Sequence, residues 1–232
     1  MGSSPSAPAR PFNFQRETID FLNGLQANNK KEWFDENRAA YDAHYIAPAK
    51  DFVAAIGPKL QELAPRITAE PRVNGSIFRV NRDIRFSKDK TPYKPHIDFW
   101  FWEGERKIAS SGLFMRLAPK GLILGAGSHG FPPDALKRYR AAVAGKAGDA
   151  LMALGTTLGK DGLELRGEHY KKLPRGFETD DPVRAKFLRH NALITTIEID
   201  HPNTLGSPAF VDFCTTQFAR VLPLHNWITA SL

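Results

Sequence analysis

Apolar side chains recur at intervals of three and four residues through the first quarter of the chain. Phe21, Leu22 and Leu25 fall on one face of this pattern. Such spacing is typical of helices that bury one side. It predicts three helices, over residues 14–26, 31–45 and 47–63. Because Gly57 and Pro58 stand inside the third helix, we expect a kink or a break there.

Beyond residue 76 the apolar positions alternate with polar ones, which is typical of strands with one buried face. The predicted strands cover residues 77–86, 96–103, 112–117, 122–125 and 193–199. Residues 118–121 (Ala-Pro-Lys-Gly) and 103–106 (Glu-Gly-Glu-Arg) have the composition of turns. Short turns between consecutive strands favour an antiparallel sheet.

Helical spacing returns in the second half of the chain. The predicted helices cover residues 134–143, 149–158, 182–190 and 208–222. Helices, then a meander of strands, then helices again predict an α+β fold. We expect an antiparallel sheet of four to six strands, with helices packed mainly on one face. The length of 232 residues predicts a single domain over residues 12–232, preceded by a disordered segment over residues 1–11.

The formal net charge is +7, and much of the excess lies in one short stretch. Between Arg66 and Lys94 the chain has eight lysines and arginines but three acidic residues. A basic surface of this kind suits phosphates, anionic metabolites or nucleic acid. The single cysteine, Cys214, excludes an internal disulfide and fits a reducing compartment. Because the apolar stretches are also too short to span a bilayer, we expect a cytoplasmic protein without membrane contact.

The two predicted strands at 77–86 and 96–103 sort their side chains by parity. In the first, apolar positions 78, 80, 84 and 86, with Arg82 among them, alternate with Arg79, Asn81, Asp83 and Arg85. In the second, Ile97, Phe99 and Phe101 alternate with His96, Asp98, Trp100 and Trp102. If the strands pair as a wide hairpin, the two polar rows share a face, which Phe114 and Arg116 of the next strand would extend.

Such a face would form a pocket for a small anion, either phosphate or carboxylate. Arginine grips such groups in a bidentate fork, and lysine adds a point charge. We expect Arg79, Arg85, Lys90 and Lys94 to hold the anion. Asp83, His96 and Asp98 would orient these groups or exchange protons, and Tyr93 and Trp100 would form walls. The pattern fits either catalysis or plain binding, and it also fits charges that merely neutralise one another on a wet sheet face.

The sequence also contains features of other functional classes. The same basic residues on an open surface would suit nucleic acid or an acidic partner, although no known nucleic-acid-binding motif is present. Residues 125–130 (GAGSHG) match the glycine pattern of dinucleotide sites, but Phe131-Pro132-Pro133 follows where a helix should continue. His96 and Asp98 supply two ligands at most, too few for a metal site. We therefore predict neither a metal nor a cofactor.

Three blocks of sequence resemble one known family. Residues 79–94 read RVNRDIRFSKDKTPYK, residues 28–34 read NNKKEWF with Tyr41 beyond them, and residues 172–177 read KLPRGF. The last block leads to Asp181-Pro182 and Phe187-Leu188. Together they resemble the uncharacterised family called domain of unknown function 2461, from about residue 12 to the C-terminus. The resemblance implies one shared domain, and it assigns no reaction to any residue.

Overall fold

One antiparallel sheet organises the fold. The structure is a computed structural model that describes residues 14–106 and 111–232. Six strands within these residues lie in the order β1-β2-β3-β4-β6-β5, and every neighbouring pair is antiparallel. The strands are β1 (Ile67–Thr68), β2 (Ile97–Glu103), β3 (Gly112–Ala118), β4 (Gly121–Ser128), β5 (Arg166–Glu168) and β6 (His190–Asp200). The predicted α+β fold with four to six antiparallel strands is confirmed.

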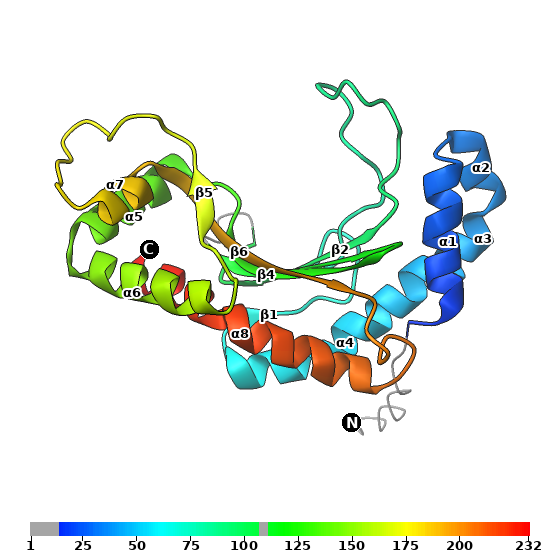
Figure 1. The fold of residues 1–232 in the computed structure, drawn as a ribbon. Helices are drawn as coiled ribbons and strands as arrows, with labels where there is room; N and C mark the ends of the chain where they lie inside the picture. Colours follow the sequence, from blue (N-terminus) through cyan, green and yellow to red (C-terminus); the bar gives the residue numbers. More distant parts are fainter. Residues whose placement is uncertain (1–13, 107–110) are drawn as a thin grey trace, which may run out of the picture.

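Helices cover one face of this sheet and leave the other open (Figure 1). The long helices α4 (Ala47–Leu63) and α8 (Ala209–Ser231) lie across the covered face. At one end of the sheet are α1 (Arg16–Ala27), α2 (Lys31–Glu36), α3 (Arg38–Tyr41) and a π-helix, η1 (Asp42–Ile46); at the other are α5 (Pro133–Ala144), α6 (Lys146–Lys160) and α7 (Pro182–Leu188). The predicted packing on one face is confirmed.

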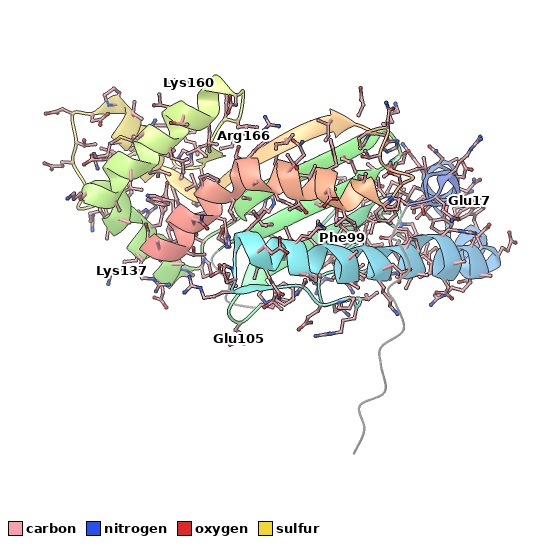
Figure 2. All side chains as sticks on the ribbon, turned by 90° about the horizontal axis from the view of Figure 1, so that it is seen from below. Glu17, Phe99, Glu105, Lys137, Lys160 and Arg166 are labelled. Carbon is pink, nitrogen blue, oxygen red and sulfur yellow. The ribbon has the colours of Figure 1, made fainter. Side chains whose placement is uncertain are left out.

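The parity of β2 fixes which side chains enter the core. Ile97, Phe99 and Phe101 are fully buried, as their alternation predicts. Figure 2 views the molecule from below, with Phe99 in the region that α4 and α8 cover. The Phe99 ring lies 5.0 Å from that of Phe52, measured between centroids, and 6.4 Å from that of Phe14. Burial of one such ring contributes about 1.5–3 kcal/mol, so this cluster binds the helices firmly to the sheet.

Several predicted elements differ from the observed ones. The helix predicted over residues 31–45 is divided at Asn37, whose side chain donates to the carbonyl oxygen of Trp33 (2.8 Å) and competes with the backbone. Of the kink or break expected at Gly57-Pro58, the break does not occur, since α4 continues through Pro58 to Leu63. The prediction of 77–86 as a strand is wrong, because these residues form only isolated bridges. The segment 1–11, predicted to be disordered, lies outside the described residues, and the single-domain boundary stays a prediction.

The two-residue turn between β3 and β4 has the predicted form. Ala118 pairs with Gly121, which leaves Pro119 and Lys120 as the turn. β4 runs further than predicted because its glycines at 125 and 127 hide its alternation. Gly127 has φ +120°, and a Cβ there would lie 2.0 Å from the carbonyl oxygen of Leu193 on β6. Only glycine fits this close approach of two strands.

A buried polar chain joins α8 to the β2–β3 end of the sheet. The Nδ1 atom of His225 lies 3.0 Å from Oγ of Ser111, and its Nε2 lies 3.3 Å from Oε1 of Glu103. Arg66 lies 3.1 Å from the other oxygen of Glu103. This order of side chains resembles a catalytic triad, but Ser111 and His225 are almost fully buried and line neither of the large cavities. These side-chain contacts therefore satisfy buried polar groups and hold α8 in place.

Candidate functional site

The open face of the sheet is the floor of the candidate site. Its side chains come from alternate positions of four strands, and the register places them in rows. One row contains Asp98, Arg116, Ile123 and Glu198. The next contains Trp100, Phe114, Gly125 and Thr196. A Cβ at Gly125 would lie 2.6 Å from the carbonyl oxygen of Thr195, so the glycine lets β4 and β6 approach closely beneath the two aromatic rings.

Residues 79–95 form an arm that rises from the edge of β2 (Figure 1). At its base the Phe78 amide donates to the carbonyl of Asp98 (3.0 Å), and Trp100 donates to Ser76 (2.9 Å). Higher up, Lys94 donates to Val80 and Arg82 donates to Pro92, both at 2.8 Å. The two sides of the arm therefore pair as an open hairpin, which agrees with part of the predicted arrangement.

Regular pairing in the arm stops beyond Arg82, so residues 77–86 do not form the predicted strand. Two causes are visible. Pro92 and Pro95 have no amide hydrogen to donate to a ladder. The carboxylates of Asp83 and Asp89 accept from the backbone amides of Arg85 (3.3 Å) and Thr91 (2.9 Å), which favours turns over extension.

The predicted parity of this segment is also reversed at its start. Ile77 is fully buried in the core, whereas Phe78 lines the open face. Phe86, predicted on the apolar side, is 95% exposed near the tip of the arm. The predicted row of Arg79, Asp83 and Arg85 beside the polar row of β2 does not form.

Asp98 is the centre of the charged groups on the open face. Its carboxylate accepts from Nε of Arg116 at 2.7 Å and from Nη2 of the same guanidinium at 3.2 Å. Nζ of Lys94 lies 3.9 Å from Oδ2. Nε2 of His96 lies 3.2 Å from the same oxygen, in an orientation that forms no aligned hydrogen bond. The Asp98 side chain is 7% exposed, so three basic groups share one buried carboxylate.

Two cavities meet at this cluster. The first, of about 620 Å³, has aromatic and apolar walls from Phe78, Trp100, Phe114, Ile123 and Ile194, with Arg106, His129, Arg166 and Glu198 around them. The second, of about 640 Å³, is lined mainly by polar residues, including Gln26, Asn29, Arg82, Asp83, Thr91 and His96. Both cavities include Lys94, Asp98 and Arg116. Their size is that of ordinary small-molecule sites.

The comparisons with known proteins agree with the resemblance in the sequence. Residues 17–227 match the family described as conserved hypothetical protein (DUF2461). The chain belongs to this family. No curated protein and no solved structure matches the chain. The family assigns no activity, so the function of this DUF2461 protein has to be argued from the site itself.

In this DUF2461 protein the predicted site residues divide into two groups. Those that line the cavities are Asp83, Tyr93, Lys94, His96, Asp98 and Trp100. Arg79, Arg85 and Lys90 line neither cavity and are exposed. Arg85 pairs with Asp83 (2.6 Å), and Lys90 donates to the carbonyl of Ile84 (3.0 Å). They contribute charge to the arm rather than contacts inside the site.

Tyr93 serves as an anchor as well as a wall. Its ring is almost buried and stacks on Phe34, with centroids 4.3 Å apart. Its backbone amide donates to Oδ1 of Asn29 (3.0 Å), and its carbonyl accepts from Nδ2 of the same side chain (2.9 Å). These contacts fix the end of the arm against α2 and the loop before it, and therefore position Lys94.

Among the side chains at the cavities that the sequence did not predict, four are basic: Arg82, Arg106, His129 and Arg166. Arg82, expected on the apolar side, lines the polar cavity and pairs with Asp89. Arg106 donates to the carbonyl of Gly75 (3.1 Å) and stands over the Phe78 ring. His129 packs edge-on against Phe114, and Arg166 bonds Thr196. His129 falls in the glycine-rich stretch 125–130, which here ends β4 of an antiparallel sheet rather than opening a dinucleotide site.

The electrostatics of the DUF2461 site follow from burial and close charges. Burial raises the pKa of the Asp98 carboxyl, but contact with His96 and Arg116 outweighs it, so the pKa is lowered below 3.8. The pKa of Lys94 is lowered, chiefly by burial. The charge of Asp98 raises this pKa, whereas the charges of Arg116 and Arg79 lower it further. Partial burial and then the charge of Arg116 lower the pKa of His129. An added negative charge would relieve the repulsion between Lys94 and Arg116.

Other predicted features can be placed in the structure. Cys214 is fully buried, and burial raises the pKa of its thiol, which fits the expected core position. No group of three His, Cys, Asp or Glu side chains among residues 14–106 and 111–232 could hold a metal ion. In that same part of the chain, none of the helices has the length and apolar character of a membrane span.

The lowered pKa of Asp98 predicts how stability depends on pH. The carboxylate contributes stability above its ordinary pKa of 3.8, and this contribution is lost as the pH falls through the lower folded value. Between about pH 6 and pH 2, urea unfolding of the wild type should therefore show a larger acid loss of stability than that of Asp98→Asn, which keeps the other carboxylates with lowered pKa values. Parallel curves for the two proteins would contradict the assignment.

Proposed function

We propose that the open face of the sheet binds a small organic anion that carries a ring, with Lys94 and Arg116 as the anion-binding groups. The proposal rests on an imbalance of charge where the two cavities meet. Lys94 and Arg116 share one buried carboxylate, Asp98, and no other acidic side chain among residues 14–106 and 111–232 forms an ion pair with either, so one positive charge is left over. Partly buried cations bind anions strongly because water screens them little.

The aromatic residues support a ring on the same ligand. Phe78, Trp100 and Phe114 line the first cavity, and none of them is fully buried. Cations already stand over two of these rings, with Lys94 Nζ 5.2 Å from the centroid of Phe78 and Arg116 Cζ 5.7 Å from that of Phe114. A planar ligand group can stack on the aromatic walls while its negative charge reaches the cations.

Substitution of Lys94 tests the proposal directly. Lys94→Gln should weaken binding of a phosphorylated or carboxylated ring compound by about 10- to 100-fold, because a charge-assisted contact is lost. The ligand would be found by thermal shift, and its affinity measured by calorimetry. Lys88→Gln is the matched control, since Lys88 is exposed in the arm and lines neither cavity. Equal affinities for the two variants would refute the role of Lys94.

A second candidate function is the binding of nucleic acid or an acidic partner. The observation that favours it is the position of basic residues beyond the cavities. Arg79, Arg85, Lys88 and Lys90 lie in the arm, and Lys171, Lys172 and Arg175 lie in the loop between β5 and α7. Figure 1 shows the arm and this loop at opposite ends of the open face. Binding to phosphates along a strand would weaken steeply with salt, whereas a small anion in the cavities would respond less.

A further inference from the structure

The two cavities share their charged residues and differ in their other walls. Lys94, Asp98 and Arg116 belong to both. On one side of them the walls are aromatic and aliphatic, and on the other they are amides, hydroxyls and carboxylates. A ligand that fills both cavities must therefore carry its negative charge in the middle, with an apolar ring at one end and a polar group at the other.

This arrangement selects among the common anions. A carboxylate and a phosphomonoester stand at the end of a molecule, because each is bonded to one organic group. A phosphodiester is bonded to two, so it can lie at the junction with a substituent in each cavity. We infer that the ligand is a phosphodiester with a planar ring on one side and a hydrogen-bonding group on the other, an inference that rests on the proposed function.

The charges at the junction support the same class. Lys94 and Arg116 carry two positive charges and Asp98 one negative charge, which leaves a single positive charge. A phosphodiester carries one negative charge and balances it. A phosphomonoester carries about −1.5 to −2 at neutral pH, more than Lys94, Arg116 and Asp98 neutralise together, so it would need a further cation such as Arg106 or Arg166 of the first cavity. The charge at the junction and the shape of the two cavities therefore both favour a phosphodiester.

Each cavity has room for at least one half of such a ligand. Each holds more than about 600 Å³, within the range of complete small-molecule sites. Trp100 offers a half-buried indole face in the aromatic cavity. In the polar cavity the side chain of Gln26, on the last turn of α1, is exposed and able to donate or accept. These two residues test the two ends of the ligand separately.

The experiment compares a dinucleoside monophosphate with the matching nucleoside 5′-monophosphate by calorimetry on the full chain. We expect the diester to bind about 10-fold tighter or more, since only the diester occupies both cavities. Trp100→Leu should weaken both compounds. Gln26→Ala should weaken the diester alone, and Asn23→Ala, an exposed substitution on α1 away from the cavities, should weaken neither. Urea unfolding confirms that each variant is folded.

The outcomes separate the two proposals. Equal affinity for diester and monoester would overturn the inference while the anion site stands. No binding of either compound, together with no thermal shift by any phosphorylated or carboxylated ring compound, would overturn the proposed function itself. Affinity that rises steadily with oligonucleotide length and falls steeply with salt would overturn the inference of a small ligand that fills the two cavities. It would indicate instead a surface that binds nucleic acid.

Discussion

Replacing Asp98 by alanine is expected to lower the free energy of unfolding by about 2–3 kcal/mol, because it leaves partly buried cations without the carboxylate that they share. Arg116 makes two hydrogen bonds to this carboxylate, and Lys94 and His96 lie within 4 Å of it. Loss of the carboxylate should therefore disturb both strand β3 and the base of the arm. Urea unfolding at neutral pH measures the effect.

The control for this prediction is Asp83→Ala. Asp83 also pairs with an arginine, Arg85, at 2.6 Å, but both side chains are largely exposed. An exposed pair contributes little because water screens it and the side chains lose conformational freedom when they pair. The control should change stability only slightly. If both alanine variants behaved alike, Asp98 would be a surface charge rather than the centre of the site.

The second large effect is expected at Gly127. Alanine there should destabilise the protein by about 3 kcal/mol or more, since strain at a positive φ and a forced contact add together. φ is +120°, and the added Cβ would lie 2.0 Å from the carbonyl oxygen of Leu193 and 2.9 Å from Cα of Ile194. Both neighbours are backbone atoms of β6, so the strand itself would have to move away.

Gly130 provides the matched comparison three residues later. A Cβ at Gly130 meets no atom within 4 Å, and its φ lies outside the positive region. Gly130→Ala should be neutral or slightly stabilising, because alanine reduces the freedom of the unfolded chain. Thermal or urea unfolding of the two variants gives the difference. Similar losses in both would show that the β4–β6 contact is less close than described.

The alternation of apolar and polar residues was sufficient to predict strand β2 but not the structure of the arm. In β2 the inward positions 97, 99 and 101 are apolar without exception, so the strand and its outward residues Asp98 and Trp100 could be predicted. Residues 77–86 alternate as well, but proline and aspartate break the ladder above Arg82. A period of two describes an extended chain and does not reveal where that chain leaves the sheet.

The assembly of the site depends on contacts between distant segments. The pairing of Asp98 with Arg116 requires the β2–β3 register, and the long connection between those strands does not fix it. In contrast, the two-residue turn at Pro119-Lys120 fixes β3 against β4. Arg106, His129 and Arg166 reach the cavities from separate parts of the chain, so no local pattern marks them. Outside the arm and β2, Phe114 and Arg116 could be anticipated, as an extension of the β2 row.

The order of the strands has a consequence for behaviour at high concentration. The four long strands, β2, β3, β4 and β6, all lie inside the sheet, and its edges are the two-residue β1 and the three-residue β5 with its irregular register. β5 lies opposite only residues 190–194 of β6, so in the part of the chain that the structure describes no strand lies beside the outer side of β6 beyond Ile194. Open backbone groups of this kind can accept a strand of another polypeptide, so edge-to-edge association would begin at this half of β6 rather than at the short edge strands.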